Sequence, residues 1–253
     1  EKSFRVLIVE LSAIHLPSRM VPRFSLTALL DALLPRACLL CGERSSATLC
    51  DACNADLPRL PEPLCPICAT PLATPAPACG SCLKSPPAYD ATFAGLRYGF
   101  PVDRLIQNLK FARRLASADF CAQSMLAGPH PEGSLILPVP LSRRHLRERG
   151  FNQALEIARP LARALALPLD ATSLTRPLET LPQSRLPWRA RKSNVRHAFA
   201  CSRDLTGHTL IIVDDVMTTG ATLDAIARTL KDHGANRVVN WVAARAVKTV
   251  PAT

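Results

Sequence analysis

Apolar residues recur along the chain in patterns that predict strands and helices. Ser134–Pro140 and Leu210–Val213 are short apolar runs that predict buried strands of the kind found in parallel sheets. Residues 223–230 follow the second run with apolar side chains at helical spacing, so we expect a helix there. A short amphipathic helix is predicted to begin at Phe24 and to end at Pro35. Strands that alternate with helices favour an α/β fold with a central parallel sheet.

Cysteines form a second pattern, because eight of the ten lie in four CxxC pairs within residues 38–82. Each CxxC turn presents two sulfurs on one side of a tight knuckle, and two turns supply the four thiolates of a tetrahedral zinc site. A disulfide framework would need an oxidising compartment, and no convincing signal peptide precedes these residues. We therefore predict two closed, structural zinc sites, with no ligand position open for water. Their ligands are Cys38, Cys41, Cys50, Cys53, Cys65, Cys68, Cys79 and Cys82.

The spacing leaves open which pairs share a metal. Eight residues separate the first and second CxxC pairs, and ten separate the third and fourth. Sequential pairing would give two consecutive ribbons, whereas pairing the first with the third would give a cross-braced module. We favour sequential pairing. The remaining cysteines, Cys121 and Cys201, have apolar neighbours in the sequence and are expected to be buried packing residues.

The distribution of charge also divides the chain into two parts, with the net positive charge in the part that has few cysteines. Residues 1–90 hold 8 Lys+Arg and 8 Asp+Glu, whereas residues 91–253 hold 23 and 12 and so carry the whole net charge of +11. We predict a poorly ordered extension at 1–23, a cysteine-rich module at 24–88 and a basic α/β domain at 89–253. No run reaches the ~18–20 uncharged apolar residues that a bilayer span needs, so no membrane insertion and a cytoplasmic location are expected.

The segment that follows the strand at 210–213 carries the clearest chemical signal. Two carboxylates, Asp214 and Asp215, precede a loop, and the predicted helix follows the loop. The loop consists of Val216, Met217 and the small residues Thr218, Thr219, Gly220, Ala221 and Thr222. Small side chains let backbone N–H groups approach an anion, and the positive end of the helix dipole faces the same loop. A Walker B strand would need a GxxxxGK[ST] loop elsewhere, which this sequence lacks. Helix capping would account for only one of the two acids.

This element resembles the phosphoribosyl pyrophosphate (PRPP) motif of type I phosphoribosyltransferases. The resemblance implies that Asp214 and Asp215 bind the ribose 2′ and 3′ hydroxyls, as the catalytic acids of the site. It also implies that residues 218–222 hold the 5′-phosphate and that Mg²⁺ accompanies PRPP.

Two clusters of basic residues accompany this motif. A lone cluster is usually a solvated face, but arginine also binds phosphate oxygens through two parallel hydrogen bonds. By the same resemblance, the loop after the strand at 134–140 faces pyrophosphate and offers Arg143, Arg144 and Arg147. A second, acid-free stretch at 181–199 corresponds to a flap over the site and offers Arg189, Arg191 and Lys192.

The order of these pieces over residues 36–246 resembles the ComF family of competence-associated proteins. Its marks are the paired CxxC module, Cys82-Leu-Lys-x-Pro-Pro87, Leu109-Lys-Phe111, Pro138-Val-Pro-Leu141, Arg149-Gly-Phe-Asn-Gln153, Gln183, Arg191-x-x-Asn194-Val, Phe199 and the Asp-Asp-Val-x-Thr-Thr-Gly-Ala-Thr element. The resemblance implies a double zinc ribbon joined to a type I phosphoribosyltransferase-like domain.

The resemblance also implies a function in DNA uptake during natural transformation. We expect a phosphoribosyltransferase that binds PRPP with Mg²⁺, with single-stranded DNA and other competence proteins as partners. The alternative is a protein without turnover that responds to PRPP or binds single-stranded DNA. The sequence shows no recognisable nucleobase pocket and sets no oligomeric state.

Overall fold

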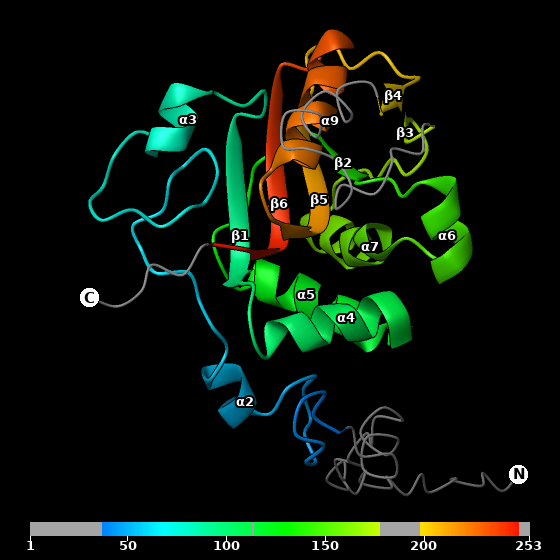
Figure 1. Ribbon diagram of the computed structural model, residues 1–253. Helices are drawn as coiled ribbons and strands as arrows, with labels where there is room; N and C mark the ends of the chain where they lie inside the picture. The colour runs from blue at the N-terminus through cyan, green and yellow to red at the C-terminus, as the bar shows by residue number, and fades with distance from the viewer. Residues whose placement is uncertain (1–36, 113, 178–197, 248–253) are drawn as a thin grey trace, which may run out of the picture. The chain divides into compact units, whose positions relative to one another are not determined.

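The computed structural model describes residues 37–112, 114–177 and 198–247, all within one compact unit, Arg36–Thr253. The extension expected at 1–23 and the helix expected to end at Pro35 lie outside these residues. One parallel sheet with the strand order β1-β6-β5-β2 forms the centre (Figure 1). Its strands are β1 (Ala91–Arg97), β2 (Leu135–Pro138), β5 (Thr209–Met217) and β6 (Arg237–Arg245).

Alternate residues of β5 face two separate hydrophobic cores, because successive side chains of a strand point to opposite faces. Leu210 and Ile212 belong to the core that contains the apolar side of α9 (Ala221–Asp232). Ile211 and Val213 belong to the core on the other face. That second core is covered by α4 (Val102–Ala112), α5 (Ala116–Leu126) and α7 (Gln153–Leu165) (Figure 1). Helices therefore cover both faces, and the predicted α/β class is confirmed.

The strand that precedes the two acids is longer than the sequence predicted. We expected it to end at Val213, but β5 continues through both carboxylates to Met217. The reason is its neighbour β6, which pairs with β5 from Arg237 to Arg245, with Met217 opposite Arg245. Asp214 and Asp215 therefore lie inside a hydrogen-bonded strand, which restrains their backbone.

The cysteine-rich segments pack into both cores. Cys38, Leu49 and Leu57 of the first segment join the core beneath α4, α5 and α7. Cys65 and Cys68 of the second join the core beneath α9, and the N–H of Thr92 in β1 donates to the Pro66 carbonyl at 3.2 Å. A short helix begins within the second CxxC turn of each segment: α2 (Asp51–Ala55) contains Cys53, and α3 (Gly80–Lys84) contains Cys82. No helix within the described residues combines the length and apolar composition that crossing a bilayer requires.

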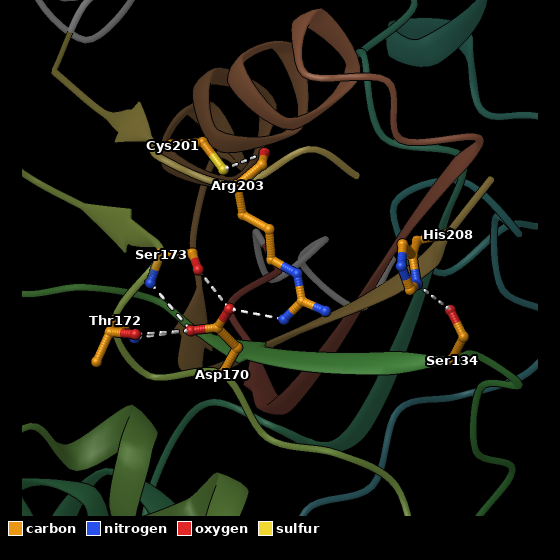
Figure 2. Close-up of polar contacts among 7 residues, drawn as sticks. All are labelled: Ser134, Asp170, Thr172, Ser173, Cys201, Arg203 and His208. Atoms are coloured by element: carbon orange, nitrogen blue, oxygen red, sulfur yellow. Dashed lines mark hydrogen bonds and ion pairs between the residues drawn. The ribbon is translucent and has the colours of Figure 1, made fainter. Parts of the chain in front are cut away.

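A carboxylate network holds the small antiparallel sheet of β3 (Leu174–Thr175) and β4 (Ala200–Cys201). Figure 2 shows Asp170 accepting hydrogen bonds from the backbone N–H groups of Thr172 and Ser173, at 3.0 and 2.9 Å. The Arg203 guanidinium donates to the same carboxylate at 3.1 Å. Burial raises the pKa of Asp170, but a hydrogen bond from the Ser173 hydroxyl, together with those from the two N–H groups and Arg203, outweighs it and holds the pKa well below its usual range. The Asp170 carboxylate therefore links Arg203, which follows β4, to Thr172 and Ser173, which precede β3.

We expect Asp170→Asn to lower the free energy of unfolding by about 1–2 kcal/mol at pH 7, because charged acceptors form the stronger hydrogen bonds. The folded-state pKa is depressed, so the contribution is present above the unfolded pKa of about 4 and is lost as the pH falls. Urea unfolding of parent and variant from pH 7 to pH 3 measures this. A difference that does not shrink toward pH 3 would contradict the assignment.

Candidate functional site

The two acids lie near the carboxyl end of β5, where parallel α/β sheets place their ligand sites. Asp215 is 4% exposed and Asp214 is half-buried. An oxygen of Asp214 accepts the backbone N–H of Asp215 at 2.9 Å, and an oxygen of Asp215 accepts that of Val216 at the same distance. Burial, together with the neighbouring negative charge of Asp215, raises the pKa of Asp214 well above its usual range. Each acid keeps carboxylate oxygen capacity for a ligand hydroxyl.

Lys110 compensates the charge of Asp215, a role that sequence reasoning missed. Its Nζ, at the end of α4, lies 2.5 Å from Oδ2 of Asp215, and their side chains are 21% and 6% exposed. Leu109-Lys-Phe111 is one of the motifs that carry the family resemblance, but this motif does not by itself indicate which residue Lys110 contacts.

The buried thiol of Cys121 lies close to this ion pair, and burial and the charge of Asp215 raise its pKa to about 12. The expected packing role of Cys121 is confirmed, while Cys201 is only half-buried at the core edge.

The loop after β5 leads into the N-terminus of α9. Thr218 and Thr219 are exposed, and Gly220 is the N-cap residue with φ of +80°. Glycine brings no capping side chain to this 12-residue helix, and the Ala221 N–H donates to Thr219 Oγ1 of the loop at 3.4 Å. The amides of a helix N-terminus and the positive end of the helix dipole favour an anion. The remaining predicted loop residues are buried or half-buried: Val216, Met217, Ala221 and Thr222.

Gly220→Ala is expected to lower the free energy of unfolding by about 1–3 kcal/mol. Alanine is strained at this positive φ, and its Cβ would lie 2.7 Å from Met217 Cε and 2.8 Å from Tyr89 Oη. Gly207→Ala is the matched control, because Gly207 has φ of +78° with open space around it. Urea unfolding should show the larger loss at residue 220. Equal losses in the two variants would contradict the close packing of Tyr89 on the loop.

Arg245 connects this loop to the second cysteine cluster. It is 7% exposed at the end of β6, and its Nε donates to the Cys68 carbonyl at 2.8 Å. Its Nη1 donates to the Met217 carbonyl at 3.1 Å and also to the carbonyls of Thr218 and Ala246. Its Nη2 donates to Thr70 Oγ1 at 3.2 Å. One buried guanidinium therefore holds both a cysteine knuckle and the start of the loop.

The eight CxxC cysteines form two groups of four. Within each group all sulfur atoms lie within 4.8 Å of one another. The groups are Cys38, Cys41, Cys50 and Cys53, and Cys65, Cys68, Cys79 and Cys82. Sequential pairing is confirmed, and the cross-braced alternative is excluded. Neighbouring thiols raise the pKa of Cys53 to about 12, chiefly through a hydrogen bond with Cys50. Four cysteine sulfurs this close together form a donor set that fits a divalent metal ion. The metal would displace the thiol protons as the thiolates bind it.

The predicted pyrophosphate residues lie on α6 (Arg143–Arg149), which begins beyond the carboxyl end of β2. Since β2 pairs with β5 in parallel, with Pro138 opposite Val213, α6 begins at the same edge of the sheet as the two acids. Arg143, Arg144 and Arg147 are exposed, and an ion pair joins Arg144 to Glu148 at 3.8 Å. The flap residues named from the sequence lie outside the described residues: Arg189, Arg191 and Lys192.

Comparisons with known proteins cover both parts of the chain. The sequence matches the double zinc ribbon domain family over residues 29–83 and the phosphoribosyl transferase domain family over residues 152–248. DNA utilization protein YhgH of Salmonella typhimurium is 37% identical over 224 residues, which are 84% of this chain and 98% of that protein. Competence protein F of Haemophilus influenzae is 32% identical over 211 residues, covering 78% and 90% of the two chains.

Similarity extends more weakly to a further relative and to solved structures. Competence protein ComFC of Bacillus subtilis is 27% identical over 203 residues, covering 74% of this chain and 79% of that protein. Adenine phosphoribosyltransferase from Thermoanaerobacter pseudethanolicus gives a TM-score of 0.32 at 15% identity, over 51% of this chain and 70% of that one.

Proposed function

Since the chain belongs to the ComF family and joins a double zinc ribbon to a phosphoribosyltransferase domain, we propose that it binds PRPP with Mg²⁺ as a phosphoribosyltransferase. The observation that carries this proposal is the pair of acids in β5, followed by a small-residue loop and a helix N-terminus whose N-cap residue is a glycine. Anion-binding amides and hydroxyl-binding carboxylates stand next to each other there. A sugar phosphate needs this combination.

The 5′-phosphate would lie against residues 218–222, where first-turn N–H groups of α9 donate to its oxygens. Asp214 and Asp215 would together accept hydrogen bonds from the ribose 2′ and 3′ hydroxyls. Lys110, now on Asp215, keeps that carboxylate charge balanced before the sugar arrives. Mg²⁺ would reach the site on the pyrophosphate oxygens, since it retains waters and needs few protein ligands.

Transfer would break the bond between C1 of the ribose and pyrophosphate through an oxocarbenium-like state. Cations near the leaving group stabilise the charge that develops on it. We assign this role to Arg143, Arg144 and Arg147 on α6 and to Arg189, Arg191 and Lys192 in the flap. The exposure of the α6 arginines supports their availability to an incoming anion.

The two four-cysteine clusters would hold one structural Zn²⁺ each. We further place the protein in the cytoplasm, with the zinc module at 24–88 and the catalytic domain at 89–253. The names of its relatives, a competence protein and a DNA utilization protein, support a role in the uptake or use of DNA.

Calorimetric titration of Mg²⁺–PRPP into the zinc-loaded chain tests this proposal. The parent should bind one PRPP per chain, and the double variant Asp214→Asn, Asp215→Asn should bind about 100-fold more weakly because both carboxyl groups that would hold the ribose hydroxyls are lost. Asp232→Asn, an exposed acid at the far end of α9, is the control and should bind like the parent. No binding by the parent, or equal binding by a folded double variant, would refute the PRPP site.

The second candidate function is a competence protein that binds PRPP or single-stranded DNA without turnover. The net charge of +11 favours contact with nucleic-acid phosphates. Pyrophosphate release in the presence of free nucleobases separates the candidates, since it requires turnover. Binding to single-stranded DNA that weakens steeply with salt, without pyrophosphate release, would favour the second.

A further inference from the structure

Tyr89 places a phenol hydroxyl against the loop that follows β5. It lies in the linker between the second cysteine cluster and β1, outside the residues that match either family model. The side chain is 5% exposed. A Cβ atom on Gly220 would lie 2.8 Å from Tyr89 Oη, so the hydroxyl reaches the backbone of the residue that caps α9. Only glycine leaves room for this approach.

Within the described residues, the Tyr89 hydroxyl has no hydrogen-bond partner. The nearby Gly220 carbonyl already accepts the Asp224 N–H at 2.8 Å, as the first hydrogen bond of α9. Polar groups as buried as this one are usually paired, because an unpaired donor costs free energy. A tyrosine hydroxyl is protonated at neutral pH and can donate. An acceptor brought by a ligand at the loop would therefore satisfy it.

The residues on either side of Tyr89 are both bonded to α9. The Ala88 N–H donates to Asp224 Oδ1 at 2.6 Å, in the first turn of the helix. Nζ of Lys231, in the last turn, donates to Asp90 Oδ1 at 2.8 Å. These contacts hold the linker on the helix before any ligand arrives, so little conformational entropy would be lost when the hydroxyl binds.

The charges around the loop are compatible with an anion. Asp224 is an acid in the first turn of α9, but Arg228 donates to both of its oxygens at 3.1 Å and balances its charge. The Arg245 guanidinium is bonded to the Met217 carbonyl at the start of the loop. Together with the positive end of the helix dipole, these cations favour a negative group at the loop.

We propose that the Tyr89 hydroxyl donates a hydrogen bond to the phosphate group held at the N-terminus of α9. The inference rests on the proposed function and adds a ligand from outside the phosphoribosyl transferase domain match. Tyr89 shares its hydrophobic core with Cys68 and Cys82 of the second cluster. The second ribbon and its linker therefore belong to the phosphate site, as the support of a residue that contacts the ligand.

The test is Tyr89→Phe, which removes the hydroxyl and keeps the ring. Calorimetry measures the binding of ribose 5-phosphate and of Mg²⁺–PRPP to the zinc-loaded chain. We expect about 10-fold weaker binding of both ligands, because a hydrogen bond to a charged acceptor is lost. Tyr98→Phe is the matched control and should bind like the parent, since Tyr98 is the other tyrosine of the chain and is half-buried beyond β1.

Urea unfolding of the ligand-free proteins separates contact with the ligand from support of the fold. Because the hydroxyl is unpaired among the described residues, Tyr89→Phe should unfold at the same urea concentration as the parent or at a higher one. A lower midpoint would overturn the proposal, because the hydroxyl would then stabilise the free protein. Equal affinity of parent and Tyr89→Phe for ribose 5-phosphate would overturn it as well, while leaving the PRPP site in place. A parent that binds neither ligand refutes the PRPP site and this contact together.

Discussion

Arg245→Met is expected to lower the free energy of unfolding by about 3–5 kcal/mol and to abolish PRPP binding. Methionine fills a similar volume but donates no hydrogen bonds. The carbonyls of Cys68 and Met217 would lose their guanidinium donor in a buried environment. The loop start and the second cysteine knuckle would then no longer be held together.

Charge adds to this effect. A zinc ion with four thiolates carries a net charge of −2, and Arg245 is the buried cation bonded to the backbone of that cluster. Arg245→Lys should recover only part of the stability, because an ammonium cannot reproduce the planar set of donors.

Urea unfolding, zinc content and PRPP calorimetry on the same preparation measure the outcome. Arg237→Met is the control, since Arg237 begins the same strand and is exposed. An Arg245→Met variant as stable as the parent, with unchanged PRPP affinity, would show that the second ribbon does not support the loop.

Lys110→Met is expected to lower the free energy of unfolding by about 2–4 kcal/mol at pH 7. The variant leaves the charge of Asp215 buried without its cation, which costs more than the ion pair itself contributes. The lower end of the range reflects the partial exposure of Lys110, which water can reach.

A double-mutant cycle isolates this interaction. Adding Asp215→Asn to Lys110→Met removes the unpaired charge and should recover most of the lost stability. Lys84→Met, an exposed lysine at the end of α3, controls for loss of positive charge. Additive effects of Lys110→Met and Asp215→Asn would contradict the ion pair.

The elements that the sequence predicted correctly are those that depend on patterns of neighbouring residues. The apolar run before Asp214 and the helical spacing after Gly220 are properties of consecutive residues, and both elements were found. The four CxxC turns are equally local, but their grouping depends on three-dimensional proximity, so the sequence left two pairings open.

Contacts between distant residues were beyond sequence reasoning. Lys110 and Asp215 are brought together by the packing of α4 beside the end of β5. The local sequence around either residue does not indicate that the other is its partner. Arg245 ends a plain apolar strand, and its partners come from a knuckle 177 positions earlier and from the loop. The extension of β5 to Met217 likewise depends on β6, whose length a local pattern does not set.

Amide hydrogen exchange of the zinc-loaded chain, with and without Mg²⁺–PRPP, tests most directly whether a phosphate lies in the loop at 218–222. We expect slower exchange in peptides that contain Thr219 to Leu223, whose N–H groups would donate to the 5′-phosphate. Peptides from α5 should exchange unchanged. Calorimetric binding of PRPP without slower exchange in this loop would show that the phosphate is held elsewhere and would contradict the proposed phosphate site.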